Sequence, residues 1–213
     1  MQLMNLMLLG VRGLAKVADG MAGAALRLGR EGALLVGSAQ GALQEAALSG
    51  RLFYASTAPT GVDPGTAIDT AAPFALANPN GSRVLLVVRK VAVGYVSGTL
   101  GAGFVAGCIG PSSQTAVTGT AVIPTAAYGG SGTGSAGKAF TTATLPATPN
   151  VAMPLVNLGA KAAATALDPA VALFDVEGGI VIEPGGSFSL QAVCAAGTSP
   201  LTVLGCAWEE IPV

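Results

Sequence analysis

VALFDVEGGIVIEPGGSFSLQAVCAAGTSPLTVLGCAWEEIPV, residues 171–213, is the stretch from which the fold class follows. It is built of short apolar runs, and runs rich in Val, Ile, Leu and Phe are typical of β-strands. Clusters of turn-forming residues separate the runs, at Pro184-Gly-Gly186 and at Gly197-Thr-Ser-Pro200. The pattern predicts strands over residues 171–175, 178–183, 187–193 and 201–208.

The same pattern continues toward the N-terminus. Arg83-Val-Leu-Leu-Val-Val-Arg-Lys-Val-Ala-Val93 predicts a long central strand because β-branched residues dominate it, and the turn signal Asn78-Pro-Asn-Gly81 precedes it. Strands do not alternate with helices, so a parallel sheet is not expected. We therefore predict a mainly β protein of about eight to ten strands, an antiparallel β-sandwich of jelly-roll-like type, over residues 51–213. Further strands are expected over residues 51–55, 72–76, 94–120 (two) and 140–145, and an extended crossing over the proline-rich residues 146–154.

Residues 1–50 differ from the rest of the chain and are expected to form an N-terminal arm, helical or extended. Leu14, Val17, Met21 and Ala25 recur at the helical period. Frequent glycines weaken a free helix by about 1 kcal/mol each. The segment is therefore expected to become ordered against a partner, and a plain helical hairpin on the flank of the domain is the alternative.

The composition favours an oligomer. Of the 213 residues, 51% are hydrophobic and only 10% are charged, which leaves a lone globule few charges for its surface. Neighbouring subunits are expected to cover much of that surface, although a Gly- and Ala-rich composition inherited from a GC-rich genome is the alternative. The net charge of −1 and the absence of a basic cluster argue against a nucleic-acid partner. The apolar start, residues 1–11, is too short to span a membrane, and no secretion signal is expected.

The sequence offers no catalytic, cofactor or metal site. The chain contains no histidine, the usual general base and a common metal ligand, so an enzyme is not expected. Gly132 to Lys138 has the spacing of a phosphate-binding loop, but Ala139 stands where Ser or Thr must hold magnesium. Cys108, Cys194 and Cys206 are expected to be free thiols, a Cys194–Cys206 contact across a hairpin being the alternative.

Interface residues are the only candidate functional residues. Trp208 is the single tryptophan, a residue type enriched at binding hot spots, although a place in the core is its alternative. Glu209 and Glu210 are adjacent on an expected strand and so should point to opposite faces, which makes them a poor acid/base pair. The complete set of candidates is Arg27, Arg30, Arg51, Phe53, Trp208, Glu209 and Glu210.

Three blocks, taken in order, resemble virion structural proteins of tailed bacteriophages. They are Gly29-Arg-Glu-Gly-Ala-Leu-Leu-Val36 with Gly50-Arg-Leu-Phe-Tyr-Ala-Ser56, then Ala77-Asn-Pro-Asn-Gly-Ser82, then Gly178-Gly-Ile-Val-Ile-Glu-Pro-Gly-Gly186 with Ala207-Trp-Glu-Glu-Ile-Pro212. These blocks and their spacing extend over about half of the chain.

The resemblance implies a non-catalytic cement or decoration protein of the capsid exterior, made in the cytoplasm of the host bacterium. Its implied partners are the major capsid protein and its own copies, as a homotrimer. A host-recognition fibre or spike domain that binds glycans, and a neck or tail component, are the alternatives.

Overall fold

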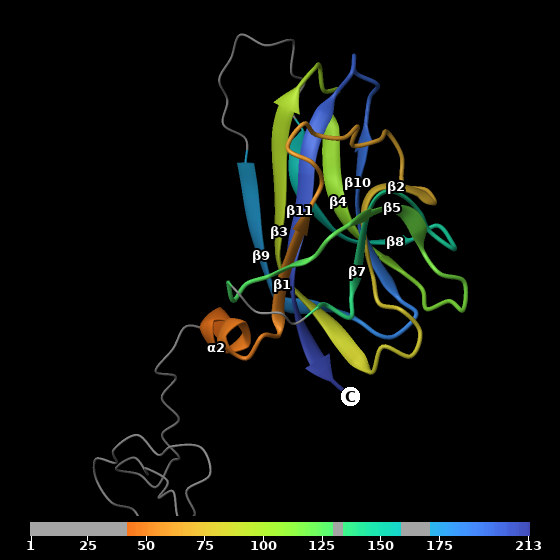
Figure 1. Ribbon diagram of the computed structural model, residues 1–213. Helices are drawn as coiled ribbons and strands as arrows, with labels where there is room; N and C mark the ends of the chain where they lie inside the picture. Colours follow the sequence, from red (N-terminus) through yellow and green to blue (C-terminus); the bar gives the residue numbers. More distant parts are fainter. Residues whose placement is uncertain (1–41, 130–133, 159–170) are drawn as a thin grey trace, which may run out of the picture. The chain divides into compact units, whose positions relative to one another are not determined.

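The computed structural model describes residues 42–129, 134–158 and 171–213 (Figure 1). Within the compact unit Leu43–Val213, two antiparallel sheets pack against each other, which confirms the predicted antiparallel β-sandwich. The short helix α2, Ala42–Leu48, precedes the first strand. Gly50, with a φ of 69°, ends the helical segment in the left-handed conformation that glycine adopts without strain. Of the arm predicted over residues 1–50, residues 1–41 lie outside the described residues, and the described remainder contains α2.

The first sheet has five strands and contains both the long strand predicted over residues 83–93 and the C-terminal strand. Each strand runs antiparallel to its neighbours. In spatial order the strands are β6 (Thr125–Ala126), β1 (Leu52–Ser56), β11 (Leu201–Pro212), β3 (Val84–Ser97) and β9 (Val171–Ile182).

The second sheet has six strands and lies to the right of the first in Figure 1. Its central strand, β10, alternates small polar and apolar residues and is buried over most of its length. In spatial order the strands are β5 (Thr118–Val122), β7 (Lys138–Thr144), β2 (Ala71–Ala77), β10 (Ser187–Cys194), β4 (Gly103–Gly110) and β8 (Asn150–Leu158).

The strand pairs are nested along the chain. β1 pairs with β11, β2 with β10, β3 with β9 and β4 with β8. The strands of the second half of the chain therefore pair with those of the first half in reverse order. Successive members of each half alternate between the two sheets. The strands β5, β6 and β7 are inserted between β4 and β8. β6 pairs with β1 at the edge of the five-stranded sheet, and β5 pairs with β7 at the edge of the six-stranded sheet.

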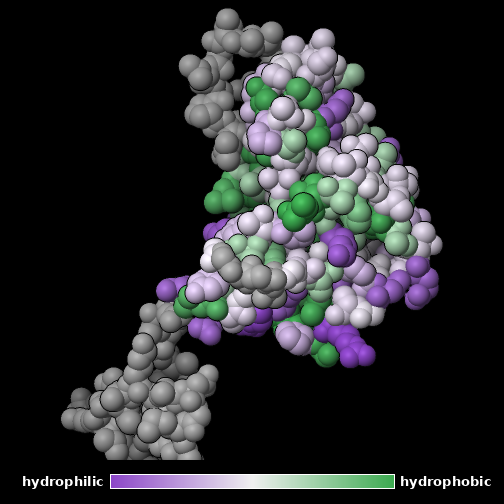
Figure 2. Space-filling view, viewed as in Figure 1, coloured by the Kyte–Doolittle hydropathy of each residue, from purple (hydrophilic) through white to green (hydrophobic). Residues whose placement is uncertain are grey.

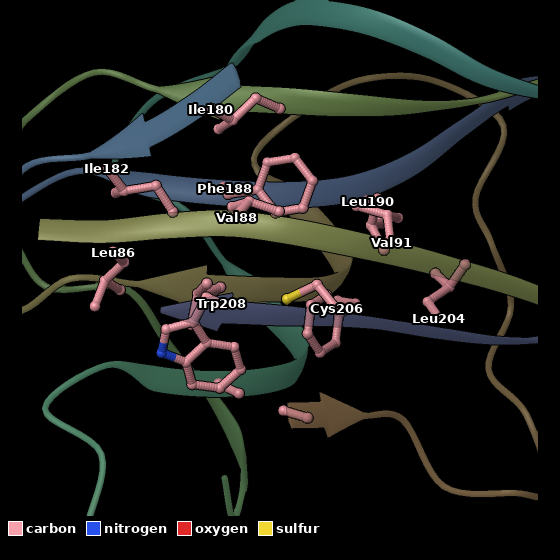
Figure 3. Packing of buried hydrophobic residues seen from close by; sticks show 14 of the residues in the cluster. Leu86, Val88, Val91, Ile180, Ile182, Phe188, Leu190, Leu204, Cys206 and Trp208 are labelled. Atoms are coloured by element: carbon pink, nitrogen blue, oxygen red, sulfur yellow. The ribbon is translucent and has the colours of Figure 1, made fainter. Parts of the chain in front are cut away.

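The core lies between the two sheets (Figure 3). Trp208, Cys206 and Leu204 of β11 point into it, and Phe188 and Leu190 of β10 meet them from the second sheet. All five side chains are at most 5% exposed. Since every second residue of a strand faces the same side, this assigns the alternate residues of β11 to the outer surface of the five-stranded sheet.

Three strands differ from their predicted extents. β9 is one strand where two were expected, because Glu177 and Gly178 adopt positive φ angles of 49° and 80° and form a bulge opposite Arg89. β8 occupies part of the expected extended crossing and includes Pro154, which an edge strand tolerates. β11 continues past Trp208 to Pro212, because residues 209–212 pair with the first residues of β3.

Candidate interaction surface

Phe53 and Trp208, two of the candidate interface residues, belong to the core. They are directly paired between β1 and β11, and their rings stack with centroids 6.1 Å apart. Phe53 is 1% exposed and Trp208 is fully buried. In this structure neither side chain can contact a partner, and the core alternative for Trp208 describes its position. Trp208 is a candidate because tryptophan is enriched at interfaces, but aromatic residues are equally typical of cores.

Glu209 lies on the outer side of β11 and joins two arginines. Its Oε1 is 3.1 Å from Nη1 of Arg51, and its Oε2 accepts hydrogen bonds from Nε (3.1 Å) and Nη2 of Arg89. The three side chains form one ion network that connects the residue preceding β1 with the β11 and β3 strands. The carboxylate is almost fully enclosed, while the Arg51 and Arg89 side chains stay 37% and 27% exposed.

Glu210 points in the opposite direction, as expected for the residue next to Glu209. Its carboxylate accepts hydrogen bonds from Ser135 Oγ (2.6 Å), from the backbone N–H of Gly137 (3.0 Å) and from Nε1 of Trp208 (3.3 Å). The backbone N–H of Ala136 is a further donor. The carboxylate of Glu210 is thus hydrogen-bonded within the chain. Its hydrogen bonds to residues 135–137 hold the end of the Gly-rich loop against β11.

Of the remaining candidates, Arg51 is the one that presents a partly exposed side chain on the described surface. Arg27 and Arg30 lie outside the described residues. The structure therefore brings Arg51 and Glu209 together, as part of a structural ion network, and separates them from Phe53, Trp208 and Glu210, which face the core.

The outer face of the five-stranded sheet carries a different set of residues, and the strand register arranges them in rows. Residues of adjacent strands that are paired directly stand side by side on the same face. Two neighbouring rows alternate with core residues and therefore point outward: Tyr54–Ala207–Lys90–Asp175 and Ser56–Gly205–Ala92–Leu173.

These rows form a groove of about 480 Å³. The centre of the floor carries only small residues, Ala207, Gly205 and Ala92. Tyr54 and Leu173 lie on opposite sides of the groove. Measured across the strands, from β1 to β9, they are separated by three strand spacings or about 14 Å.

Three large apolar side chains are exposed around this groove. Tyr54 is 44%, Leu173 62% and Ile123 86% exposed, the last from the segment between β5 and β6. Sequence reasoning missed all three, although Tyr54 could have been found from the alternation that buries Phe53. In the space-filling view, pale and green areas dominate and strongly hydrophilic residues form scattered groups (Figure 2). Grouped exposed apolar residues are typical of interaction surfaces.

Among the described residues that line the groove, Lys90 alone is charged, and its charge is neutralised locally. Lys90 Nζ lies 3.0 Å from Oδ2 of Asp175. The hydrogen bond from Lys90, followed by the one from the backbone N–H of Glu177, lowers the pKa of Asp175, so its carboxylate is ionised at neutral pH. The described lining of the groove is therefore apolar, with a paired charge at its side.

The three cysteines are free, as predicted, and Cys194 and Cys206 belong to different sheets. Burial raises the pKa of Cys108 to about 11 and also raises that of Cys206. Both are therefore uncharged thiols at neutral pH.

Within the described residues, no group of three or more acidic, cysteine or histidine side chains is placed to bind a metal ion. The described part of the chain likewise has no helix with the length and hydropathy of a membrane span.

The fold and the groove together define a β-sandwich with an exposed apolar outer face. Comparison with protein-family models, with curated proteins and with solved structures found no match for this chain.

Proposed function

We propose that this protein is a non-catalytic structural component of a tailed-bacteriophage particle, a cement or decoration protein that stabilises the capsid from outside. The observation that carries the proposal is the apolar groove around Tyr54, Ile123 and Leu173 on a chain with only 10% charged residues. Such a surface gains free energy when other subunits cover it, at about 25 cal/mol per Å² of apolar area. The three blocks described above that resemble phage virion proteins support the choice of particle.

The proposal includes a jelly-roll fold for the sandwich. A jelly roll is an antiparallel ribbon folded over into two sheets, so strands of the outgoing half pair with their counterparts of the returning half. The four nested pairs, β1 with β11, β2 with β10, β3 with β9 and β4 with β8, support this assignment. Jelly rolls are common in viral capsid and lectin domains, and the fold alone does not select between these uses.

The proposed mechanism is thermodynamic. A protein that binds the assembled shell and not its separated subunits stabilises the shell by mass action, by about 2.7 kcal/mol at a hundred times its Kd. A homotrimer at a junction between capsomers makes three contacts that act together through their effective concentration. No chemical step is required of the chain, and the ion networks of Glu209 and Glu210 serve to keep the sandwich rigid.

The test is reconstitution with shells of the major capsid protein encoded in the same genome. Shells assembled without this chain are mixed with the purified full chain, sedimented and analysed by gel, and their disassembly temperature is measured. We expect saturable binding at a fixed ratio and a higher disassembly temperature. Absence of binding, at chain concentrations that exceed the capsid subunits, refutes the proposal. A few copies per particle, rather than one set per capsomer junction, indicate a neck or tail component instead.

One feature favours the alternative of glycan recognition. A pocket of about 260 Å³ lies beside the end of β2 and combines the ring of Phe140 with polar side chains, among them Gln114, Thr115 and Lys138. Sugar sites combine aromatic and polar groups in this way. Specific binding of the full chain on a glycan array, abolished by Phe140→Ala and Lys138→Ala, would support a host-recognition role.

A further inference from the structure

The pocket of about 260 Å³ beside the end of β2 lies on the outer side of the six-stranded sheet. Lys138 and Phe140 of β7 flank Ala139, which belongs to the core between the sheets, so both side chains point outward. The rest of the wall comes from residues 77–80, 113–117 and 185–186. Pockets for drug-sized ligands measure about 300–1,000 Å³, so this one suits a smaller molecule.

Hydrogen bonds hold the wall of this pocket in place. Asn80 Nδ2 donates to the carbonyl oxygen of Ser113 (2.9 Å), and the backbone N–H of Ser113 donates to that of Gly185 (3.0 Å). The N–H of Gly185 in turn donates to the carbonyl oxygen of Asn78 (2.7 Å). Gly185 has a φ of 87°, and a Cβ there would lie 2.6 Å from Asn80 Oδ1, so a larger residue would push these segments apart. The pocket is therefore formed before a ligand arrives, which lowers the entropic cost of binding.

The lining offers the groups that recognise a sugar ring. The half-buried ring of Phe140 can pack against the apolar C–H face of a pyranose. The side-chain amide of Gln114 and the hydroxyl of Thr115 belong to exposed residues, and both can donate hydrogen bonds to sugar hydroxyls and accept them. An apolar surface with a few placed polar groups is the usual composition of a small-molecule site.

Lys138 gives the pocket a positive charge. It is the one charged residue among the described residues that line the pocket. Arg51, Arg89 and Lys90 each have a carboxylate partner, whereas no ion pair within the described part of the chain involves Lys138. Glu183, two residues before Gly185, lines a neighbouring pocket and is hydrogen-bonded there. An ammonium group without a carboxylate partner, beside a small hollow, favours an anionic ligand.

We propose that this pocket binds an acidic sugar, a pyranose that carries a carboxylate group as a uronic acid does. The ring lies on Phe140, the carboxylate pairs with Lys138, and the hydroxyls bond to Gln114 and Thr115. The inference goes beyond the cement role and does not depend on it, and it names the class of glycan for the host-recognition alternative. One exposed ion pair and one ring contact give a weak site, which becomes effective when many copies are displayed together.

Matched ligands test the proposal in a nuclear magnetic resonance titration of the isotope-labelled full-length chain. The methyl glycosides of glucuronic acid and glucose differ only at the exocyclic carbon, which is a carboxylate in the first and a hydroxymethyl group in the second. We expect saturable, millimolar binding of both, with the glucuronic acid glycoside about fivefold tighter, the most that one exposed ion pair contributes. Acetate, which has the charge without the ring, should not saturate the pocket in the same range. The amide shifts should map to residues 113–117, 138–140 and 185–186.

Three variants assign the roles of the side chains. Lys138→Met should make the two glycosides bind equally well, because it removes the charge and keeps most of the side chain. Phe140→Leu should weaken the binding of both, because it keeps apolar volume but removes the flat ring. Lys90→Met is the matched control, since it removes a lysine from the other sheet, and both affinities should equal those of the wild type. The fluorescence of Trp208 and the far-ultraviolet circular dichroism verify that each variant is folded.

A wild type that binds neither glycoside saturably overturns the inference, as does equal affinity for the two glycosides. An unchanged preference for the acidic glycoside in Lys138→Met, or amide shifts that map outside the pocket, overturns it as well. The outcomes also distinguish this inference from the proposed function. A chain that binds shells but neither glycoside refutes the sugar site alone. A chain that binds the acidic glycoside through Lys138 but binds no shells retains the sugar site and refutes the cement role.

Discussion

Glu209 and Glu210 are adjacent on β11 yet serve opposite sides of the five-stranded sheet. Glu209 forms ion pairs with Arg51 and Arg89 on the outer side of the sheet. Glu210 faces the core beside Trp208, and its carboxylate accepts a hydrogen bond from the backbone N–H of Gly137. Both carboxylates are buried, at 5% and 8% exposure. A buried carboxylate is tolerated when its oxygens are fully hydrogen-bonded, so each residue depends on its own set of donors.

Replacement of Glu210 tests its role in holding the Gly-rich loop. Glu210→Ala removes the acceptor of four donors and should lower the free energy of unfolding by about 2–3 kcal/mol. Glu210→Gln keeps one carbonyl oxygen and should cost less than Glu210→Ala. Urea denaturation followed by Trp208 fluorescence measures both. Equal stability of Glu210→Ala and the wild type would contradict this role.

A double-mutant cycle separates the two arginines of the outer network. Arg89 makes two contacts with Glu209 and is less exposed than Arg51, which makes one. Exposed ion pairs contribute about 0.2–1 kcal/mol, and screening weakens them further. We expect the coupling of Arg89→Met with Glu209→Gln to exceed that of Arg51→Met with Glu209→Gln. The reverse order of the two coupling energies, obtained from denaturation, would be inconsistent with the geometry.

The buried thiols predict how stability depends on alkaline pH. Burial raises the pKa of Cys108 from 9.0 to about 11, so below pH 9 the thiol is protonated in both the folded and the unfolded state. Between pH 9 and about pH 11 the unfolded chain loses this proton first, and stability falls by up to about 1.4 kcal/mol per pH unit. Cys108→Ala should flatten the decline in that interval. Unfolding free energies of both proteins at several pH values provide the test, and parallel curves would exclude the effect.

Deletion of residues 1–41 tests the predicted N-terminal arm. The cut is placed before Ala42, the first residue of α2, because α2 from Leu43 onward belongs to the same compact unit as the sandwich. The truncated chain should keep its circular dichroism spectrum and unfolding temperature but lose binding to shells. A truncated form that still decorates shells at full occupancy would contradict the assignment of the arm to binding.

The strands themselves could be predicted because each depends on local chemistry. The valine-rich run predicted from residue 83 forms β3. The turn at Asn78 is stabilised by the side-chain amide of Asn78, which donates hydrogen bonds to the carbonyl oxygens of Val84 (2.8 Å) and Ile182 (2.9 Å). The nested pairing and the insertion of β5 to β7 depend on contacts between residues far apart in sequence. Neither turn signals nor alternation specifies which distant strands meet.

The candidate surface was harder to predict for a related reason. Trp208 is a candidate by residue type, but residue type does not tell which side of a strand faces the core. Ile123 precedes a proline in a segment without regular alternation, so no periodic signal marked it as exposed. The groove appears only once the register aligns Gly205 with Ala92 and Ala92 with Leu173.

A cryo-electron microscopy map of the intact particle tests the central claim most directly. We predict trimers of this chain on the outside of the shell at capsomer junctions, with Tyr54, Ile123 and Leu173 of each copy covered by a neighbouring subunit. A shell exterior that lacks the chain, or decorating copies whose grooves face open solvent, would contradict the account.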